Sequence, residues 1–355
     1  MKNVAIVTCI GKSNFGNRLQ NYALQKVIED MGYNVETLEN ISYLNNIDNY
    51  EENYKEYLEY KEEKEKRDYS NRFRITYFED FDKNVKFREG IVTAMDLSNT
   101  GYDYYVVGSD QVWNPHHGKL KDLDLLVGIE DSKRIAYAAS IGIDELPDNV
   151  KDKAKREWLK FKAISVREDK GKEIIEELSG RNDVQVSLDP TMLLTSEEWS
   201  KLAKRPKQLK TDKYILNYFL GELSEQRKNE IERIARENDC EIINILDKNG
   251  PFYETGPSEF LYLEQNAFLI CTDSFHSSVF SILFNRPFIV FNREDINKSM
   301  NSRIDTLINT FKLKNRNYEG KITEDNLKHD YSETYKILDS KRIEANEYLS
   351  KALRD

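Results

Sequence analysis

Residues 269–293 constrain the fold of this chain more than any other stretch. The apolar run from Leu269 to Thr272 is typical of a buried strand, and a polar turn, a short apolar helix and a second buried strand follow it. A strand that passes through a turn directly into a helix is typical of a parallel α/β sheet, whose ligands bind at the carboxyl ends of the strands. His276, one of four histidines in the chain, lies in that turn.

The same alternation of strand and helix occurs elsewhere in the chain. A strand at Val4–Ile10, a helix from about Arg18 to Met31 and a strand at Asn34–Leu38 form a first β-α-β unit. Further strands, each ending in small or polar residues, are expected at Tyr104–Val107, Arg134–Ala138, Ala163–Val166, Val184–Leu188, Tyr214–Phe219 and Glu241–Ile245. The sequence therefore predicts doubly wound parallel sheets, with ligands bound where these strands end.

A chain of 355 residues is longer than one compact core usually serves, so two domains are expected. We predict a first Rossmann-like lobe at 1–203 and a second at 213–330, joined by the polar, proline-containing linker 204–212. The segment 331–355 ends the chain as a charged helix that could pack back across the first lobe. Residues 48–90 are an insertion rich in charge and tyrosine, either a solvated helix packed on the lobe or a mobile lid over the acceptor.

Charge and composition exclude several classes of partner. The formal net charge of −10 argues against sequence-independent binding of nucleic acid. No stretch approaches the roughly 18 apolar residues of a membrane-spanning helix, so any membrane contact is expected to be peripheral at most. Three widely spaced cysteines, and an N-terminal apolar run too short for a signal peptide, favour a cytoplasmic protein. Whether the chain forms a homo-oligomer stays open.

His276 and Arg167 are the candidate catalytic residues. A histidine at the start of a helix can exchange a proton near neutral pH, although a structural role as a helix cap would explain it too. Arg167 directly follows a buried strand, so its guanidinium could bind a phosphate or carboxylate bidentately, unless it pairs with a neighbouring acid. Ser274 and Ser277 add hydroxyls beside His276, and Arg293 follows the next strand at the same edge of the sheet.

The loop before the first helix and the turn after Tyr104–Val107 provide the remaining candidates. Gly16 permits a tight turn in the loop, and Asn17 offers a side-chain amide to a substrate or to the helix end. The loop has neither the Walker spacing nor the Gly-x-Gly-x-x-Gly spacing of a dinucleotide site. Asp110 could orient a hydroxyl or accept its proton. The histidines assemble no site of metal-ligand spacing, so neither a metal nor a cofactor is expected.

Five motifs, in their order along the chain, resemble the polysaccharide pyruvyl transferase family. They are Asn14–Gln25, Val107–Asn114, Ser165–Glu168, Leu188–Thr191 and Thr272–Ser277. The resemblance extends over about residues 3 to 312 and leaves out the insertion and the C-terminal tail. It implies a fold similar to the glycosyltransferase-B architecture, with two Rossmann-like lobes and the active site between them.

The resemblance also implies a reaction. It implies transfer of pyruvate from phosphoenolpyruvate to two hydroxyls of a sugar, in a surface glycan or exopolysaccharide or in its lipid- or nucleotide-linked precursor, to form a cyclic ketal. His276 matches the family histidine, which implies a general acid that protonates the methylene carbon of the donor. Arg167 matches the family arginine, and the helix opening near Ser277 would hold the phosphate. Many members place a lysine or arginine where Arg293 stands, so Arg293 is a departure if lysine is required.

Two other functions are compatible with the sequence. A nucleotide-sugar-dependent glycosyltransferase of the same architecture would need a carboxylate for the ribose in the second lobe, and Asp247 or Glu254 could serve. A non-catalytic member would bind a glycan or a partner enzyme, although the presence of both His276 and Arg167 argues against a decayed site. A Ser-His-Asp hydrolase is disfavoured because the chain has no Gly-x-Ser-x-Gly motif.

Overall fold

The structure, a computed structural model, describes residues 1–40, 47, 51–52, 54–55, 58–59, 72–115, 120–293, 302–328 and 330–354. The chain divides into two compact units. Unit 1 comprises Met1–Ile75, Asp82–Leu193 and Lys341–Asp355, and unit 2 comprises Thr76–Phe81 and Leu194–Ser340. Of the insertion expected at 48–90, most of the part before Arg72 lies outside the described residues. The choice between a solvated helix and a lid therefore stays a prediction.

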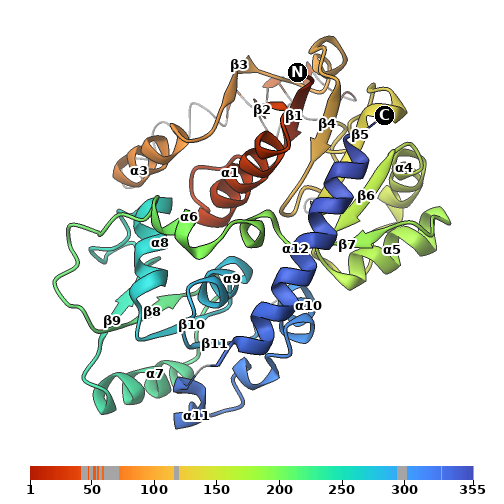
Figure 1. The fold of residues 1–355 in the computed structure, drawn as a ribbon. Coiled ribbons are helices and arrows are strands. Elements are labelled where there is room, and N and C mark those ends of the chain that lie inside the picture. The colour runs from red at the N-terminus through yellow and green to blue at the C-terminus, as the bar shows by residue number, and fades with distance from the viewer. Residues whose placement is uncertain are drawn as a thin grey trace. The chain divides into compact units, whose positions relative to one another are not determined.

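Unit 1 is built on a seven-stranded sheet in the order β3-β2-β1-β4-β5-β6-β7, in which all neighbouring strands are parallel (Figure 1). Its strands are β1 Asn3–Val7, β2 Asn34–Glu39, β3 Phe87–Ile91, β4 Tyr104–Val107, β5 Arg134–Ala139, β6 Ala163–Val166 and β7 Gln185–Val186. Its helices are α1 Phe15–Asp30, α4 Asp148–Trp158, α5 Asp169–Ser179 and the short 3-10 helices η2 Leu97–Asn99, η4 Asp131–Lys133 and η5 Pro190–Leu193. The helix α3, Arg72–Asp82, has residues in both units.

The central strands of this sheet are buried on both faces. Every residue of β4 and β5 is buried, as the continuous apolar runs of a covered parallel sheet predict. On one face the core includes Trp113 and Trp158, whose ring centroids lie 5.5 Å apart. Tyr137 of β5 contacts Tyr348 of α12, with ring centroids 6.1 Å apart. The strands expected at these positions are confirmed, and their carboxyl ends form one edge of the sheet.

The edge strand β3 was not predicted, because its sequence lies within the stretch assigned to the charged insertion. It pairs with β2 through Thr37 and Phe87 and again through Glu39 and Ile91, with a register shift between the two contacts. Its residues are half-buried or exposed, so an apolar pattern is missing. Edge strands are often polar, since one side of the strand has no neighbour and charge there discourages aggregation.

Unit 2 is built on a four-stranded parallel sheet in the order β11-β10-β8-β9. Its strands are β8 Tyr214–Tyr218, β9 Glu241–Asn244, β10 Leu269–Thr272 and β11 Phe288–Val290. Its helices are α6 Ser196–Ser200, α7 Glu225–Glu237, α8 Pro257–Asn266, α9 Phe275–Leu283, α10 Ser302–Thr310, α11 Glu324–Leu327 and the 3-10 helix η7 Lys314–Arg316. The strand, turn, helix and strand predicted around His276 are β10, the turn, α9 and β11.

The two units divide at Leu193, earlier in the chain than the linker expected at 204–212. Residues after Leu193 belong to unit 2 because they pack on its helices. The ring of Trp199 lies 5.2 Å from that of Phe280, and the N–H of Lys204 donates to the carbonyl of Ser258 at 2.9 Å. Polar composition therefore marked a surface segment of unit 2 and missed the point of division.

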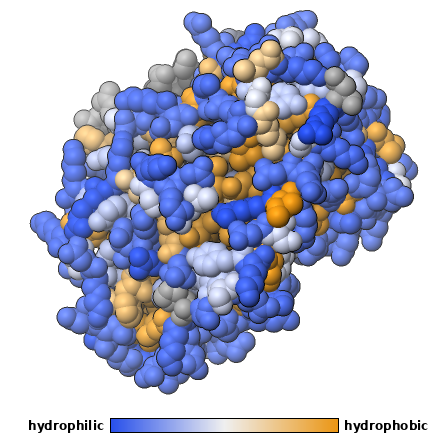
Figure 2. All heavy atoms as spheres, in the orientation of Figure 1, coloured by the Kyte–Doolittle hydropathy of each residue, from blue (hydrophilic) through white to orange (hydrophobic). Residues whose placement is uncertain are grey.

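The last helix, α12 Ser332–Ala352, supplies residues to both units. Its residues from Lys341 onward belong to unit 1, where the hydroxyl of Tyr348 donates to the carbonyl of Ala136 at 2.7 Å. The face of the molecule in Figure 2 is mostly hydrophilic, in keeping with a charged fraction of 33%. Among the described residues, no helix has the length and apolar composition needed to cross a membrane.

Candidate active site

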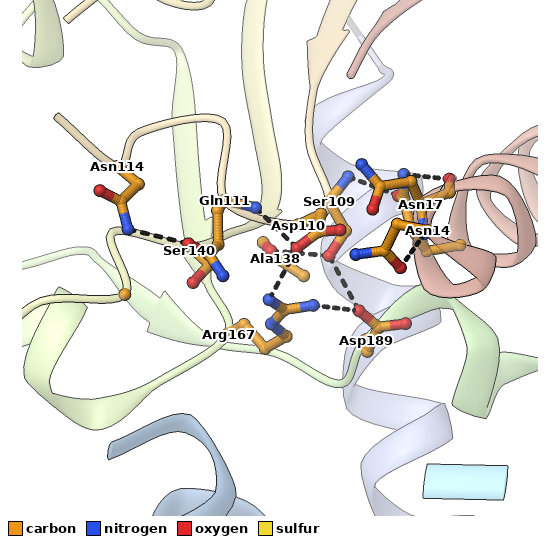
Figure 3. A network of polar contacts seen from close by, with 12 residues as sticks. Asn14, Asn17, Ser109, Asp110, Gln111, Asn114, Ala138, Ser140, Arg167 and Asp189 are labelled. Atoms are coloured by element: carbon orange, nitrogen blue, oxygen red, sulfur yellow. Dashed lines mark hydrogen bonds and ion pairs between the residues drawn. The ribbon is translucent and has the colours of Figure 1, made fainter. Parts of the chain in front are cut away.

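Arg167 follows β6 in unit 1, where its guanidinium is buried between two carboxylates (Figure 3). Its Nη1 donates to Oδ2 of Asp189 at 2.8 Å, and its Nη2 donates to Oδ1 of Asp110 at 3.2 Å. The side chain of Arg167 is 1% exposed. Burial lowers the pKa of Arg167, but the charges of Asp110 and Asp189 outweigh this effect and raise the pKa, so the guanidinium stays charged.

These ion pairs differ in part from what the sequence suggested. Ion pairing was the alternative to ligand binding for Arg167, with Glu168, Asp169 or a neighbouring helix as the source of the partner, and the observed partners are Asp110 and Asp189. Glu168 instead accepts hydrogen bonds from two backbone N–H groups in the loop after β5. An anionic ligand bound by Arg167 would therefore share the guanidinium with two carboxylates that already contact it, or replace one of them.

A tight backbone turn after β4 presents Asp110 to this cluster. Gly108 has φ +123°, and a Cβ at this residue would lie 2.1 Å from the carbonyl oxygen of Tyr137, so only glycine fits. Asp110 itself has φ +63°, and its carbonyl accepts a hydrogen bond from the N–H of Ser140 at 2.8 Å. The turn is thereby held against the end of β5, with the Asp110 carboxylate beside Arg167.

Ser109 connects this cluster to the first helix. Its Oγ lies 3.0 Å from Oδ2 of Asp189 and 2.9 Å from the carbonyl oxygen of Ala138. Its N–H donates to Oε1 of Gln20 at 2.9 Å, and Nε2 of Gln20 donates to the carbonyl of Asn17 at 2.9 Å. One continuous network of polar contacts therefore runs from the start of α1 to the ends of β4 and β6.

Gly16 and Asn17 occupy the first turn of α1. Asn14 caps this helix, and its Oδ1 accepts a hydrogen bond from the N–H of Asn17 at 3.4 Å. Gly16 is buried and Asn17 is half-buried. The structure therefore brings three of the predicted residues, Asn17, Asp110 and Arg167, into one network, and Gly16 lies next to it in the chain.

His276 lies in unit 2, in the first turn of α9. Ser274 is the N-cap of this helix, and its Oγ accepts a hydrogen bond from the N–H of Ser277 at 3.5 Å. The Oγ of Ser278 donates back to the carbonyl of Ser274 at 3.0 Å. His276 is buried, and its ring meets that of Phe275 edge to face at 5.4 Å. Ser274 thus has the capping role that had been considered for the histidine itself.

Ser277 is directed toward the interior of unit 2. Its Oγ donates to Oε1 of Glu264, a buried residue of α8. Burial raises the pKa of Glu264 well above its usual range, although hydrogen bonds from Ser277 and Ser281 lower it, so the neutral acid is favoured. The side chain of Ser277 therefore holds α9 against α8, and a hydrogen bond from its hydroxyl to a substrate would require it to leave Glu264.

Arg293 follows β11 and lies at the edge of the sheet where β10 ends. Its Nε donates to Oδ2 of Asp273 at 3.1 Å, and the side chains of Arg293 and Asp273 are 8% and 4% exposed. Asp273 also accepts hydrogen bonds from the N–H groups of Leu220 at 2.7 Å and Gly221 at 2.8 Å. Asp273, three residues before His276, therefore connects Arg293 to the loop that follows β8.

Three acids that complete these clusters were not among the predicted site residues: Asp189, Asp273 and Glu264. Asp189 and Asp273 come soon after the strands β7 and β10, and this position at the carboxyl end of a strand could have identified them. Glu264 lies within α8, a helix with no such signal. Within the described ranges, no group of three or more histidine, cysteine and acidic residues is arranged to hold a metal ion.

Each unit thus has a parallel sheet with polar side chains gathered where its strands end. This arrangement defines both units as Rossmann-like, a class of α/β fold that binds its ligands at that edge. Residues 14–295 match the family model of polysaccharide pyruvyl transferase. The match covers well over half of the sequence, so the chain belongs to the polysaccharide pyruvyl transferase family, and the resemblance carried by the five motifs is confirmed.

Solved structures support the fold prediction. A UDP-GlcNAc 2-epimerase from Methanocaldococcus jannaschii has a TM-score of 0.51 and 13% identity, over 95% of this chain and 92% of that one. The Neisseria meningitidis UDP-GlcNAc 2-epimerase, solved with UDP-GlcNAc bound, has a TM-score of 0.50 and 10% identity, over 99% of this chain and 100% of that one. At these identities the likeness shows the fold alone, and it confirms the two Rossmann-like units of a glycosyltransferase-B-like architecture. A comparison with curated proteins gave no match.

Proposed function

We propose that this protein transfers the pyruvate unit of phosphoenolpyruvate to two hydroxyls of a sugar, in a surface glycan or its precursor, and forms a cyclic ketal. The observation that carries this proposal is the family match over residues 14–295, a range that contains both polar clusters. We place the reaction in the cytoplasm, because Cys9, Cys240 and Cys271 are all free thiols, as is usual in a reducing compartment.

The reaction needs one proton delivered to carbon. Protonation of the methylene carbon converts it to a methyl group and leaves C2 electrophilic. One sugar hydroxyl then adds to C2, the C2–O bond to phosphate breaks, and the second hydroxyl closes the ketal. The two hydroxyls lose one proton each: one replaces the proton consumed at the methyl carbon, and the other protonates the departing phosphate.

His276 is the residue that we propose as the general acid. An imidazole is the side chain whose ordinary pKa suits proton transfer near neutral pH, and such transfer typically contributes about 10²–10⁴-fold to the rate. His276 lies in the first turn of a helix, where backbone N–H groups and the helix dipole favour an anionic ligand. A histidine at this position would be near the phosphate or carboxylate of a donor bound at the helix end.

Arg167 and Arg293 are the cations that we propose for the two anionic groups of the donor. Each already contacts a carboxylate, Asp110 and Asp189 for Arg167 and Asp273 for Arg293. We propose that donor binding at Arg167 displaces Asp110, whose carboxylate could then accept a proton from an acceptor hydroxyl. Asn17 and Gly16 are proposed for the acceptor side of the same cluster.

The test is phosphate release from phosphoenolpyruvate across nucleotide- and lipid-linked sugars, for the wild type, His276→Asn and Ser278→Ala. Asparagine keeps polar atoms at the position and removes the acid, so kcat should fall by about 10²–10⁴-fold, with a melting temperature close to that of the wild type. Ser278→Ala removes a hydroxyl from the same helical turn and should retain activity within a few-fold.

Two results would reject the proposal. Full acceptor-dependent release by His276→Asn would exclude the histidine as the acid. Failure of every acceptor to elicit phosphate release, together with transfer of sugar from a nucleotide donor, would assign the protein to the glycosyltransferases instead.

A further inference from the structure

A pocket of about 480 Å³ lies in unit 2 at the carboxyl ends of β8 and β9. Its walls come from these two strands, from the loops that follow them and from α7, which connects them. The pocket is therefore built within a single β-α-β unit, the first of its sheet. None of the residues predicted for pyruvyl transfer lines it, and the proposed chemistry at His276 makes no use of it. Asp247, which the sequence offered as the ribose carboxylate of a glycosyltransferase, does line it.

The charges around this pocket do not suit phosphoenolpyruvate. Glu232 and Asp247 contribute two carboxylates, whereas Lys228 contributes one cation. The Nζ of Lys228 already pairs with Glu225 at 2.6 Å. Glu232 in turn lies 3.7 Å from Arg236. The pocket thus has no excess of positive charge to hold phosphoenolpyruvate, while hydroxyl and N–H donors would find acceptors.

The other lining residues suit a flat, largely apolar group. Phe219, Leu223, Ile231, Ile242 and Leu246 form the apolar part of the wall. Phe219 is half-buried and fixed by an edge-to-face contact with the ring of Phe291 at 5.4 Å. Two amides add polar groups at the strand ends, since Nδ2 of Asn217 donates to Oδ1 of Asn244 at 2.9 Å. An aromatic heterocycle has both an apolar face and polar edges of this kind.

Asp247 places a carboxylate after the second strand of this β-α-β unit, a position that binds ribose in Rossmann-like folds. It comes shortly after β9, the second strand of the β-α-β unit, and it lines the pocket. In Rossmann-like folds a carboxylate after the second strand accepts hydrogen bonds from the hydroxyls of a ribose. The first loop of the unit contains one glycine, Gly221, and lacks the Gly-x-Gly-x-x-Gly spacing that binds a dinucleotide pyrophosphate.

We propose that this pocket binds a ribonucleoside group, with its base on the apolar wall and its ribose hydroxyls on Asp247. This inference rests on the proposed function, in which the nucleoside is part of a nucleotide-linked acceptor sugar. The pocket and the His276 turn share a loop, since Gly221 lines the pocket and donates its N–H to Asp273, three residues before His276. A nucleoside in the pocket would thus carry its attached sugar along the edge where His276 lies.

The first experiment measures binding without any transfer chemistry. Uridine, cytidine, adenosine, guanosine and their 2′-deoxy forms are titrated by calorimetry into the wild type, Asp247→Asn and Asp212→Asn. We expect at least one ribonucleoside to bind more tightly than its deoxy form, and Asp247→Asn to weaken the ribonucleoside about tenfold or more. The ribo-to-deoxy preference should shrink toward one in that variant. Asp212→Asn, a surface substitution near the start of β8, should bind as the wild type does.

Three outcomes would overturn the proposal. They are no binding of any nucleoside at millimolar concentration, equal binding of ribo and deoxy forms by the wild type, and unchanged affinity in a folded Asp247→Asn variant. Competition by free monosaccharides that is equally sensitive to Asp247→Asn would identify a carbohydrate pocket instead. Phosphoenolpyruvate should not compete with the nucleoside.

The second experiment separates this inference from the proposed reaction. His276→Asn should bind the nucleoside as well as the wild type does, even when it releases no phosphate. Asp247→Asn should raise the KM for a nucleotide-linked acceptor about tenfold, with the KM for phosphoenolpyruvate unchanged. Nucleoside binding without pyruvyl transfer would reject the proposed reaction and support the nucleoside pocket. Pyruvyl transfer to acceptors that lack a nucleotide, without nucleoside binding, would support the reaction and reject the pocket.

Discussion

Arg167 is a buried cation with two carboxylate partners, so its removal would leave two buried negative charges and lower the free energy of unfolding. In Arg167→Met, Asp110 and Asp189 would stay buried without a compensating charge, which costs about 3–5 kcal/mol of unfolding free energy. Urea denaturation compared with Arg236→Met provides the measurement. Arg236 is exposed and lies 3.7 Å from Glu232, so its loss should cost less than about 1 kcal/mol.

Arg167→Met would also separate two roles of this residue. A variant as stable as the wild type that loses affinity for phosphoenolpyruvate would mean that the cation serves the ligand alone. A destabilised variant is the expected result, and it would mean that the cluster is first of all a structural element at the ends of β4 and β6.

Asp124 predicts a pH dependence of stability. Burial raises its pKa from 3.8 to about 6, although Lys121 and Lys153 act to lower it. The folded state thus binds the proton more tightly than the unfolded state does, so the stability associated with this proton is present below about pH 4 and is lost as the pH rises through 6. The wild type should lose about 2 kcal/mol relative to Asp124→Asn between pH 4 and pH 7.

Unfolding by urea at the two pH values measures this difference. Asp131→Asn is the control, because the side chain of Asp131 is 68% exposed and its replacement should give a difference nearly independent of pH. If the difference in unfolding free energy between the wild type and Asp124→Asn does not change with pH, Asp124 is solvated in solution. The backbone of Asp124 accepts the indole N–H of Trp113 at 2.8 Å, so the residue also matters for the loop that follows the Asp110 turn.

At the scale of elements, α12 offers a matched pair of tyrosines. The hydroxyl of Tyr348 donates to the carbonyl of Ala136 in unit 1, and the hydroxyl of Tyr335 donates to the carbonyl of Ile282 in unit 2. Replacement of either by phenylalanine leaves a buried carbonyl without this donor and should cost about 1 kcal/mol. Hydrogen exchange should then increase around β5 in Tyr348→Phe and around α9 in Tyr335→Phe. Equal increases in both units for both variants would mean that the units unfold as one block.

The elements were largely predictable because parallel strands buried on both faces are continuous apolar runs. Tyr104–Val107 and Ala163–Val166 begin and end where the sequence indicated. The strand β3 could not be predicted in this way, since an edge strand with Arg88, Glu89 and Gly90 has no apolar pattern. The last helix, Ser332–Ala352, lies within the segment 331–355 that was expected to form it. Its exact ends could not be predicted, because helix ends depend on caps and packing more than on composition.

The positions of the candidate residues at strand ends were predictable from the sequence, and their contacts were much less so. Sequence position identifies which side chains follow a strand, and this placed Arg167, Asp110 and His276 correctly at strand ends. It does not identify ionic partners, which lie 57 and 22 residues from Arg167 along the chain. The inward direction of Ser277 was predictable in principle, because Ser277 and Ser281 are one helical turn apart and share a face.

At the scale of the whole molecule, neither unit is a continuous piece of sequence. Unit 1 is assembled from three segments and unit 2 from two. A truncation placed at the expected linker 204–212 would leave unit 1 without Lys341–Asp355 and would keep part of unit 2 attached. Functional dissection of the two sheets therefore depends on point substitutions within the full chain.

This division of the chain bears on the order in which the protein can form during its synthesis. Domains commonly fold as their residues leave the ribosome, the N-terminal one first. Here the first residues and the last belong to the same unit, and Tyr33 near the N-terminus donates its hydroxyl to the carbonyl of Leu353 at 2.7 Å. The unit that is begun first must wait for Lys341–Asp355, so the unit begun later, whose residues end at Ser340, can be complete before it.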